Sequence, residues 1–236
     1  MSAIVHDSEA LLLRRVELGE ADLVVTLFTR TLGRVSALAR GARRSQKRFG
    51  GALEPFFTLR VRLEERPRSE LFALSEARIA RPRLGMLNDL TRLEVAGRAL
   101  SWVRKTAPPR TPEPECFAHI ERVFDRLAAG APELLPQREL AELGLSLLGA
   151  FGWAIDFERC VRCGKACPEA ARAALDAASG GLVCRDCGGG RIRLGAAQRA
   201  RFARAAQGES AALGEDDVKL ALDLVERVFA AHAGVE

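Results

Sequence analysis

The first eighty residues show short apolar runs separated by turn signals. Gly19-Glu20, Leu32-Gly33, Gly50-Gly51 and Arg66-Pro67 separate five runs that are rich in Val, Leu, Phe and Thr: residues 10–18, 23–31, 34–40, 56–64 and 70–79. Such runs are typical of β-strands. Five short strands in this length predict a small closed or nearly closed barrel, because a sheet of this size must hide its edges.

After Pro82 the spacing of apolar residues changes from strand-like to helical. Asn88 or Asp89 is a plausible N-cap for the first helix. Helices are predicted over residues 89–106, 115–129, 136–151, 196–206 and 216–232. The expected fold is therefore multidomain α+β: a barrel domain over residues 1–82, a helical domain over residues 83–155 and 193–236, and a cysteine-rich insert over residues 156–192.

That insert holds five of the six cysteines of the chain. Cys160 and Cys163 form one CxxC pair, and Cys184 and Cys187 form a second. Two matched pairs at this separation are typical of a zinc ribbon, in which each pair points two thiolates at one ion. Gly164 and Gly188 follow the pairs and permit the positive backbone angles that such knuckles need. We predict a structural Zn²⁺ site, because four thiolates leave no open coordination position.

Cys167 is a fifth thiol close to the predicted site. Its spacing from Cys163 would allow it to replace a ligand, but we favour a free thiol. No residue is predicted to be catalytic. The sequence has no GxxxxGK[ST] loop, no HExxH and no GxSxG, so an enzyme is not expected.

The positive charge of the chain is concentrated in its first third. Residues 1–84 contain sixteen basic and ten acidic residues, a net charge of +6, and residues 23–53 contain seven basic residues and no acidic one. A field of one sign attracts nucleic acid. The predicted DNA contacts are Arg34, Arg40, Arg43, Arg44, Lys47, Arg48 and Phe49. Phe49 could stack on an unpaired base or could plug the barrel core, and both remain open.

The sequence also predicts the cellular compartment of the protein. The N-terminus has no signal peptide pattern and no apolar run is long enough to span a bilayer, so we expect a cytoplasmic protein without a membrane partner. Clustered thiols in that compartment are more often metal ligands than disulfides.

Several stretches resemble the RecO family of bacterial recombination mediators. One of them is ARGARRSQKRFGGALEPF, residues 39–56, which looks like the family's basic loop. Also similar are residues 9–15, LGEAD at 18–22, Phe28-Thr29 before Gly33, CVRCG at 160–164 after Asp156-Phe157, and GGLVC at 180–184. The similarity runs in order through nearly the whole chain. Two departures are the extra Cys167 and the alanine-rich, helix-like segment 168–178, where the family has a ribbon hairpin.

The resemblance implies an N-terminal OB-fold, a helical C-terminal domain and a zinc ribbon within it. It also implies binding of single- and double-stranded DNA, annealing of complementary strands, and work with RecR to load RecA onto DNA coated by single-strand-binding protein. A contact with the C-terminal tail of that coating protein, a nucleoid-associated location and the lack of a small-molecule substrate follow from the same resemblance. The alternative that stays open is a zinc-ribbon protein–protein adapter whose barrel binds RNA.

Overall fold

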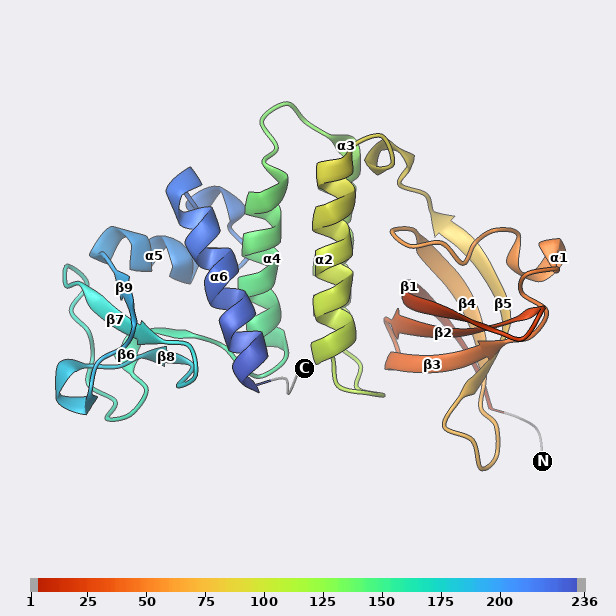
Figure 1. The fold of residues 1–236 in the computed structure, drawn as a ribbon, viewed down its shortest axis with the longest axis horizontal. Helices are drawn as coiled ribbons and strands as arrows, with labels where there is room; N and C mark the ends of the chain where they lie inside the picture. Colours follow the sequence, from red (N-terminus) through yellow and green to blue (C-terminus); the bar gives the residue numbers. More distant parts are fainter. Residues whose placement is uncertain (1–3, 233–236) are drawn as a thin grey trace. The chain divides into compact units, whose positions relative to one another are not determined.

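The computed structural model describes residues 4–232, which form two compact units (Figure 1). The first unit lies within residues 1–134 and the second within residues 135–236. The first unit therefore contains the barrel together with two long helices. The finer division into barrel, helical and cysteine-rich domains stays a prediction.

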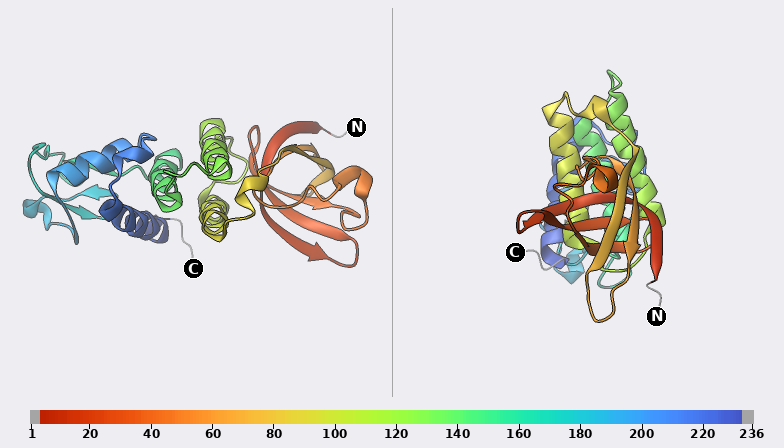
Figure 2. Two further views of the ribbon diagram at one scale, coloured as in Figure 1. Left: turned by 90° about the horizontal axis from the view of Figure 1, so that it is seen from above. Right: turned by 90° about the vertical axis from the view of Figure 1, so that its right-hand side faces the viewer.

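The barrel of the first unit consists of β1 (Val5–Leu18), β2 (Asp22–Thr29), β3 (Gly33–Ala39), β4 (Thr58–Glu64) and β5 (Phe72–Arg81). These strands close in the order β1-β2-β3-β5-β4, as an OB-fold does. The strands wrap around a common axis, and the right-hand view of Figure 2 shows this most clearly. All neighbours are antiparallel except β3 and β5, whose parallel seam pairs only Ala37 with Phe72 and Leu38 with Ala73. The predicted closed barrel is confirmed.

Alternating side chains fill the barrel. Val25, Leu27, Val35, Leu59 and Leu63 are all at most 4% exposed and belong to one core cluster. The residues between them along each strand point outward. This is the alternation of inward and outward side chains that the sequence predicts. Closure leaves no long sheet edge open to another chain.

The outer face of β1, β2 and β3 carries aliphatic and polar side chains. Val16 lies opposite Val24, and Val24 lies opposite Leu38. One step along the strands, a second row joins Arg14, Thr26 and Ser36. Among the described residues of the barrel, four phenylalanines (Phe28, Phe49, Phe57 and Phe72) are buried and Phe56 is half-buried. The outer face of these three strands therefore presents no aromatic ring.

Two helices complete the first unit: α2 (Leu90–Thr106) and α3 (Pro114–Ala129), after the short turn η1 (Leu84–Met86). They lie side by side next to the barrel (Figures 1 and 2). Asp89 caps α2 by accepting a hydrogen bond from the backbone N–H of Arg92 at 3.1 Å, which selects one of the two predicted caps. Phe117 of α3 meets Phe28 of β2 at 5.9 Å between ring centroids. Trp102 is buried on α2.

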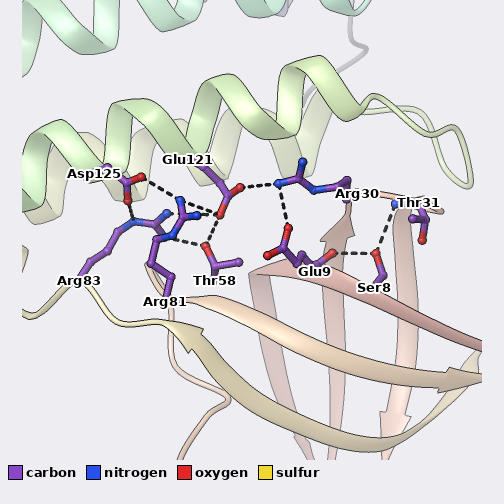
Figure 3. Close-up of polar contacts among 9 residues, drawn as sticks. All are labelled: Ser8, Glu9, Arg30, Thr31, Thr58, Arg81, Arg83, Glu121 and Asp125. Atoms are coloured by element: carbon purple, nitrogen blue, oxygen red, sulfur yellow. Dashed lines mark hydrogen bonds and ion pairs between the residues drawn. The ribbon is translucent and has the colours of Figure 1, made fainter.

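A partly buried ion-pair network fastens α3 to the barrel, and we call it the joint (Figure 3). Glu121 accepts hydrogen bonds from Thr58 of β4 and from Arg30, the latter at 2.8 Å. Arg83 donates from Nε to Asp125 at 2.8 Å, and its Nη2 lies 3.5 Å from Glu121. The side chains of Arg83 and Glu121 are only 1% and 5% exposed. Such a pair is costly to break, because either partner alone would be an uncompensated buried charge.

The second unit combines α4 (Pro136–Ala150), α5 (Ala196–Ala205) and α6 (Glu215–His232) with a small sheet. Helices α4 and α6 lie side by side in both Figure 1 and Figure 2. The sheet has the order β6-β8-β7-β9, with β6 (Asp156–Cys160), β7 (Ala173–Asp176), β8 (Gly181–Leu182) and β9 (Ile192–Leu194). Trp153 contacts Phe229 of α6 edge to face at 6.1 Å.

One sequence expectation of the second unit is wrong. The alanine-rich segment 168–178 is not helical, because its residues 173–176 form strand β7, antiparallel to both β8 and β9. Leu175 is fully buried there. Pairing on both edges and burial of one leucine outweigh the helix propensity of the alanines. Among the helices of residues 4–232, none is long and apolar enough to cross a membrane.

Candidate nucleic-acid interface and metal centre

Four cysteine sulfurs converge at one point of the second unit. Each pair of sulfurs among Cys160, Cys163, Cys184 and Cys187 lies within 4.8 Å, and Cys163 Sγ is 3.8 Å from Cys184 Sγ. A Zn–S bond of about 2.3 Å in a tetrahedron places two sulfurs about 3.8 Å apart. The four predicted ligands are therefore brought together at a spacing that fits one such ion.

The backbone around the cluster has the shape of two knuckles. Gly164 and Gly188 have φ angles of +73° and +101°, as the sequence predicts. The N–H of Gly164 donates to the carbonyl of Cys160 at 2.8 Å. Arg162 crosses between the knuckles and donates to the carbonyl of Cys187 at 2.8 Å. The cluster is thus held by main-chain geometry rather than by the thiols alone.

The acid–base chemistry of the thiols also fits a cation. The backbone N–H of Cys184 donates to the sulfur of Cys160 and lowers the pKa of that thiol to about 6. Hydrogen bonds with the side chains of Cys184 and then Cys163 raise the pKa of Cys187 to about 12. A metal ion is bound by thiolates, so a divalent cation at this cluster would displace the protons that its four sulfurs carry.

Cys167 is outside this cluster. Among the described residues, the group of side chains that could hold a metal ion contains the four paired cysteines and not Cys167. Its backbone is fixed by a hydrogen bond from its N–H to Glu158 and by Arg199, which donates to the carbonyls of Cys167 and Pro168. That the Cys167 thiol is free stays a prediction.

The second candidate site is the segment between β3 and β4, residues 40–51, which we call the basic loop. It contains one turn of helix, α1 (Gln46–Phe49), capped by the hydroxyl of Ser45. Gly41 and Gly50 take positive φ angles at its two bends. The carboxylate of Asp22 accepts a hydrogen bond from the N–H of Gly41 at 2.8 Å. The basic loop is therefore a folded structure on the end of the barrel.

Phe49 anchors the basic loop from inside. Its ring is 3% exposed and belongs to the barrel core cluster. Arg48 lies over the same ring at 5.2 Å. Of the two roles left open for Phe49, this position favours the core plug, because a ring so deeply buried offers no face to a base.

The cationic side chains of the basic loop point to solvent. Arg40, Arg43, Arg44, Lys47 and Arg48 are all exposed. Among residues 4–232, no acidic side chain forms an ion pair with Arg40 or Lys47. Arg48 already uses one of its donors, because its Nη2 donates to the carbonyl of Arg40 at 2.7 Å. Five cations are thus gathered on one short, well-anchored segment.

Two glutamates from outside the acid-free stretch lie against the basic loop. Glu17 pairs with Arg43 at 3.2 Å, and Glu20 pairs with Arg44 at 3.0 Å. Both acids are on the β1–β2 hairpin, and their side chains are 68% and 90% exposed. Exposed pairs of this kind are weak, so a phosphate can compete for these arginines.

Arg34 is a predicted DNA contact near the start of β3, whereas the basic loop follows the end of that strand. It is half-buried, and its Nε donates to the carbonyl of Ala107 at 2.7 Å. Arg34 therefore helps to hold the connector between α2 and α3. Arg68 and Arg110 lie in the same neighbourhood and were not predicted, because they are forty-two residues apart and no local pattern joins them.

Two family models match almost the whole chain. "Recombination protein O N terminal" matches residues 1–83, and "Recombination protein O C terminal" matches residues 87–235. The junction between them falls between β5 and α2.

Individual relatives agree with the family models. A "DNA repair protein RecO" of Anaeromyxobacter sp. (strain Fw109-5) is 39% identical over 179 residues, 75% of this chain and 68% of the relative. The protein of the same name from Myxococcus xanthus is 39% identical over 183 residues, covering 78% and 72%. That from Geobacter metallireducens is 35% identical over 181 residues, covering 77% and 72%. With its closed five-stranded barrel, its helices and its cluster of four cysteines, this chain belongs to the RecO family of DNA repair proteins.

Proposed function

We propose that the chain binds single- and double-stranded DNA through the basic loop, anneals complementary strands, and helps RecR to load RecA onto strands coated by single-strand-binding protein. The observation that carries the DNA-binding part is the set of exposed cations on the basic loop, anchored by the buried ring of Phe49. Because the backbone of this segment is already folded, it loses little conformational freedom when its cations meet phosphates.

We propose that the basic loop binds the phosphates of the DNA rather than its bases. Proteins that bind single strands often stack bases on aromatic side chains. The outer face of β1, β2 and β3 offers none, and Phe49 is in the core. Binding through phosphates releases counterions, so affinity should fall steeply as salt rises and should depend little on sequence.

Binding through phosphates is compatible with strand annealing. The base edges of a strand held by its backbone remain free to pair with a second strand. The cations reduce the repulsion between two polyanions, and base pairing supplies the free energy. The reaction needs no catalytic residue, so the chain is proposed to be a mediator and not an enzyme.

The remaining partners rest on family membership. The relatives carry the name DNA repair protein, and their family works on DNA. We infer that RecR and the C-terminal tail of single-strand-binding protein are partners of this chain and that it acts at the nucleoid in the cytoplasm. The cysteine cluster is proposed to hold Zn²⁺ as a structural ion, since its four thiols fill a tetrahedral shell.

The test is a salt titration of single-strand affinity. The variant R43A/R44A/K47A/R48A removes four exposed cations, and each lost phosphate contact should lower the log–log slope by about 0.7, so the slope should fall by about 2.8. A matched control, R191A/R193A/K219A/R227A, removes the same charge from exposed positions of the second unit. An unchanged slope in the basic-loop variant would defeat the assignment, as would an equal fall in the control.

Annealing is measured on the same two variants with labelled complementary oligonucleotides. The basic-loop variant should anneal more slowly than the unmodified chain, and the control should not. Unaccelerated annealing by the unmodified chain itself would instead favour a protein–protein adapter.

A further inference from the structure

An open groove of about 710 Å³ lies on the first unit, away from the basic loop. One wall is β3 at Arg34, Val35 and Ser36. The other walls are residues 68–71, which lead into β5, and residues 109–110 of the connector between α2 and α3. The groove is therefore built from three segments of one compact unit.

The groove exists because the β3–β5 seam is short. Only Ala37 and Leu38 of β3 pair with β5, so the first half of β3 has no strand beside it. The α2–α3 connector fills part of that place: Arg34 forms an isolated parallel bridge with Pro109, and the N–H of Arg110 donates to the carbonyl of Arg34 at 3.0 Å. The space that remains is the groove.

The connector is seated closely on the barrel. A Cβ atom on Gly33 would lie 1.9 Å from the carbonyl oxygen of Thr111, so only glycine fits there. Gly33 also has a φ angle of +68°. The position of the connector, and with it the shape of the groove, is thus fixed by contact with the backbone of the barrel.

Three arginines line the groove against a single carboxylate. Arg34, Arg68 and Arg110 come from its three walls, and Glu70 is the one acidic residue among the lining residues. Arg68 and Arg110 are exposed and Arg34 is half-buried. An excess of cations around a concave site favours an anionic ligand.

Two of the three guanidinium groups are held in place while keeping donors free. Arg34 uses Nε for the carbonyl of Ala107. Arg110 uses one terminal nitrogen for the carbonyl of Glu70 at 3.2 Å and lies 5.0 Å above the ring of Phe72. A guanidinium has five N–H donors, so each of these retains others for an oxyanion.

The backbone is also unusual at two of these arginines. Arg68 and Arg110 have φ angles of +62° and +53°, in the left-handed region that non-glycine residues rarely adopt. Such residues tend to gather at functional sites, where the strain is maintained by the surrounding structure. Here both line one groove.

The groove continues the outer face of the barrel. Ser36 lines it and lies opposite Thr26, which lies opposite Arg14. Along β3, Arg34 at the groove and Arg40 at the basic loop are six residues apart, which is about 20 Å of strand. A single strand could therefore contact both sites on one domain, within the range of site sizes of about 4–16 nucleotides for such barrels.

We propose that this groove is a second phosphate-binding site, in which Arg34, Arg68 and Arg110 bind the backbone of the same single DNA strand that the basic loop holds. The inference rests on the proposed DNA binding and adds the ligand path: from the basic loop, along β3, to the groove. The chemical class of the ligand is a nucleic-acid phosphodiester.

The experiment measures the salt dependence of single-strand affinity for the full chain and three double variants. R68N/R110N removes two charges, with asparagine chosen because it tolerates the left-handed region. R68K/R110K keeps the charges. R60Q/R78Q removes two charges from exposed, facing positions on β4 and β5.

We expect R68N/R110N to lower the slope by about 1.4. We expect R68K/R110K and R60Q/R78Q to keep the slope of the unmodified chain. An unchanged slope in R68N/R110N overturns the proposed groove site, and so does an equal fall in R60Q/R78Q, which would indicate only a general effect of net charge. A fall of similar size in R68K/R110K also overturns it, because it would indicate damage to the loops.

A second measurement locates the DNA directly. A photoreactive benzoylphenylalanine in place of Ser69, which lines the groove, should cross-link to a labelled oligonucleotide, whereas the same group in place of Lys219 of α6 should not. Absence of a cross-link at Ser69 from a chain that still binds the oligonucleotide overturns the groove site. Failure of the unmodified chain to bind in a salt-dependent way is distinct from these results and overturns the proposed function as well.

Discussion

The joint and the basic loop use the same residue type in opposite ways. At the joint, Arg83 is 1% exposed and reaches Asp125, Glu121 and Thr58 (Figure 3). It also donates to the carbonyl of Phe56. In the basic loop, Arg43 and Arg44 are 42% and 69% exposed and each pairs with one exposed glutamate. The first arrangement fixes a helix on the barrel. The second leaves its cations able to exchange a carboxylate for a phosphate, so burial and partner number separate a structural arginine from a binding one.

The cysteine cluster is a second closed arrangement, and removing the Zn²⁺ that we propose it holds should have the largest effect. On the order of 10 kcal/mol of folding free energy is at stake for a structural zinc site. Chelation should remove the hydrogen-exchange protection of residues 156–194 and leave the salt slope of single-strand binding unchanged, because the basic loop belongs to the other unit.

The matched variants for this test are C184S and C167S. The first removes a sulfur of the cluster and should lower the bound metal measured by elemental analysis, whereas the second removes a sulfur outside it and should not. Protection of the ribbon amides that survives complete loss of metal would contradict a structural role for the ion.

The next largest effect is expected at the joint. The E121A substitution leaves Arg83 buried without one of its carboxylates and should cost about 3–5 kcal/mol of stability. The free energy of opening from amide exchange in β2 and β3 measures it. The control is E20A, whose side chain is 90% exposed and should change stability by no more than about 0.5 kcal/mol. Equal costs for the two variants would erase the contrast between the joint and the basic loop.

The smallest effect is a gain. The variant E17Q/E20Q releases Arg43 and Arg44 from their exposed partners, and single-strand affinity should rise about two- to fivefold while stability changes little. Titration of a labelled oligonucleotide at fixed salt measures it. The control variant E158Q/E169Q removes two exposed acids from the second unit and should leave the affinity unchanged. Weaker binding by E17Q/E20Q would mean that these glutamates position the arginines rather than compete for them.

The sequence predicted the parts whose signals are local. Alternation within strands such as Thr58–Glu64 and the helical spacing of residues 90–106 led to the barrel and the long helices. Two CxxC pairs with glycines beside them led to the four-sulfur cluster. In each case the signal itself lies in a few neighbouring residues, such as one CxxC pair or one strand, so a short window of sequence contains it.

The parts that were missed depend on residues distant in sequence. Arg83 and Glu121 are thirty-eight residues apart, and nothing in either neighbourhood indicates the joint. The acid-free stretch suggested an unopposed positive field, but the fold of the β1–β2 hairpin sets Glu17 and Glu20 against it. The alanine-rich segment became β7 because its partners β8 and β9 lie outside it. In each of these three cases, contacts between residues distant in the sequence determine the structure.

The two tryptophans give the molecule a built-in optical label for each unit. The chain has no tyrosine, and its two tryptophans are Trp102 in the first unit and Trp153 in the second. Indole emission of the protein is therefore the sum of one signal from beside the barrel and one from beside α6. A W102F chain would report the second unit alone and a W153F chain the first, so the melting of each half can be followed without cutting the polypeptide.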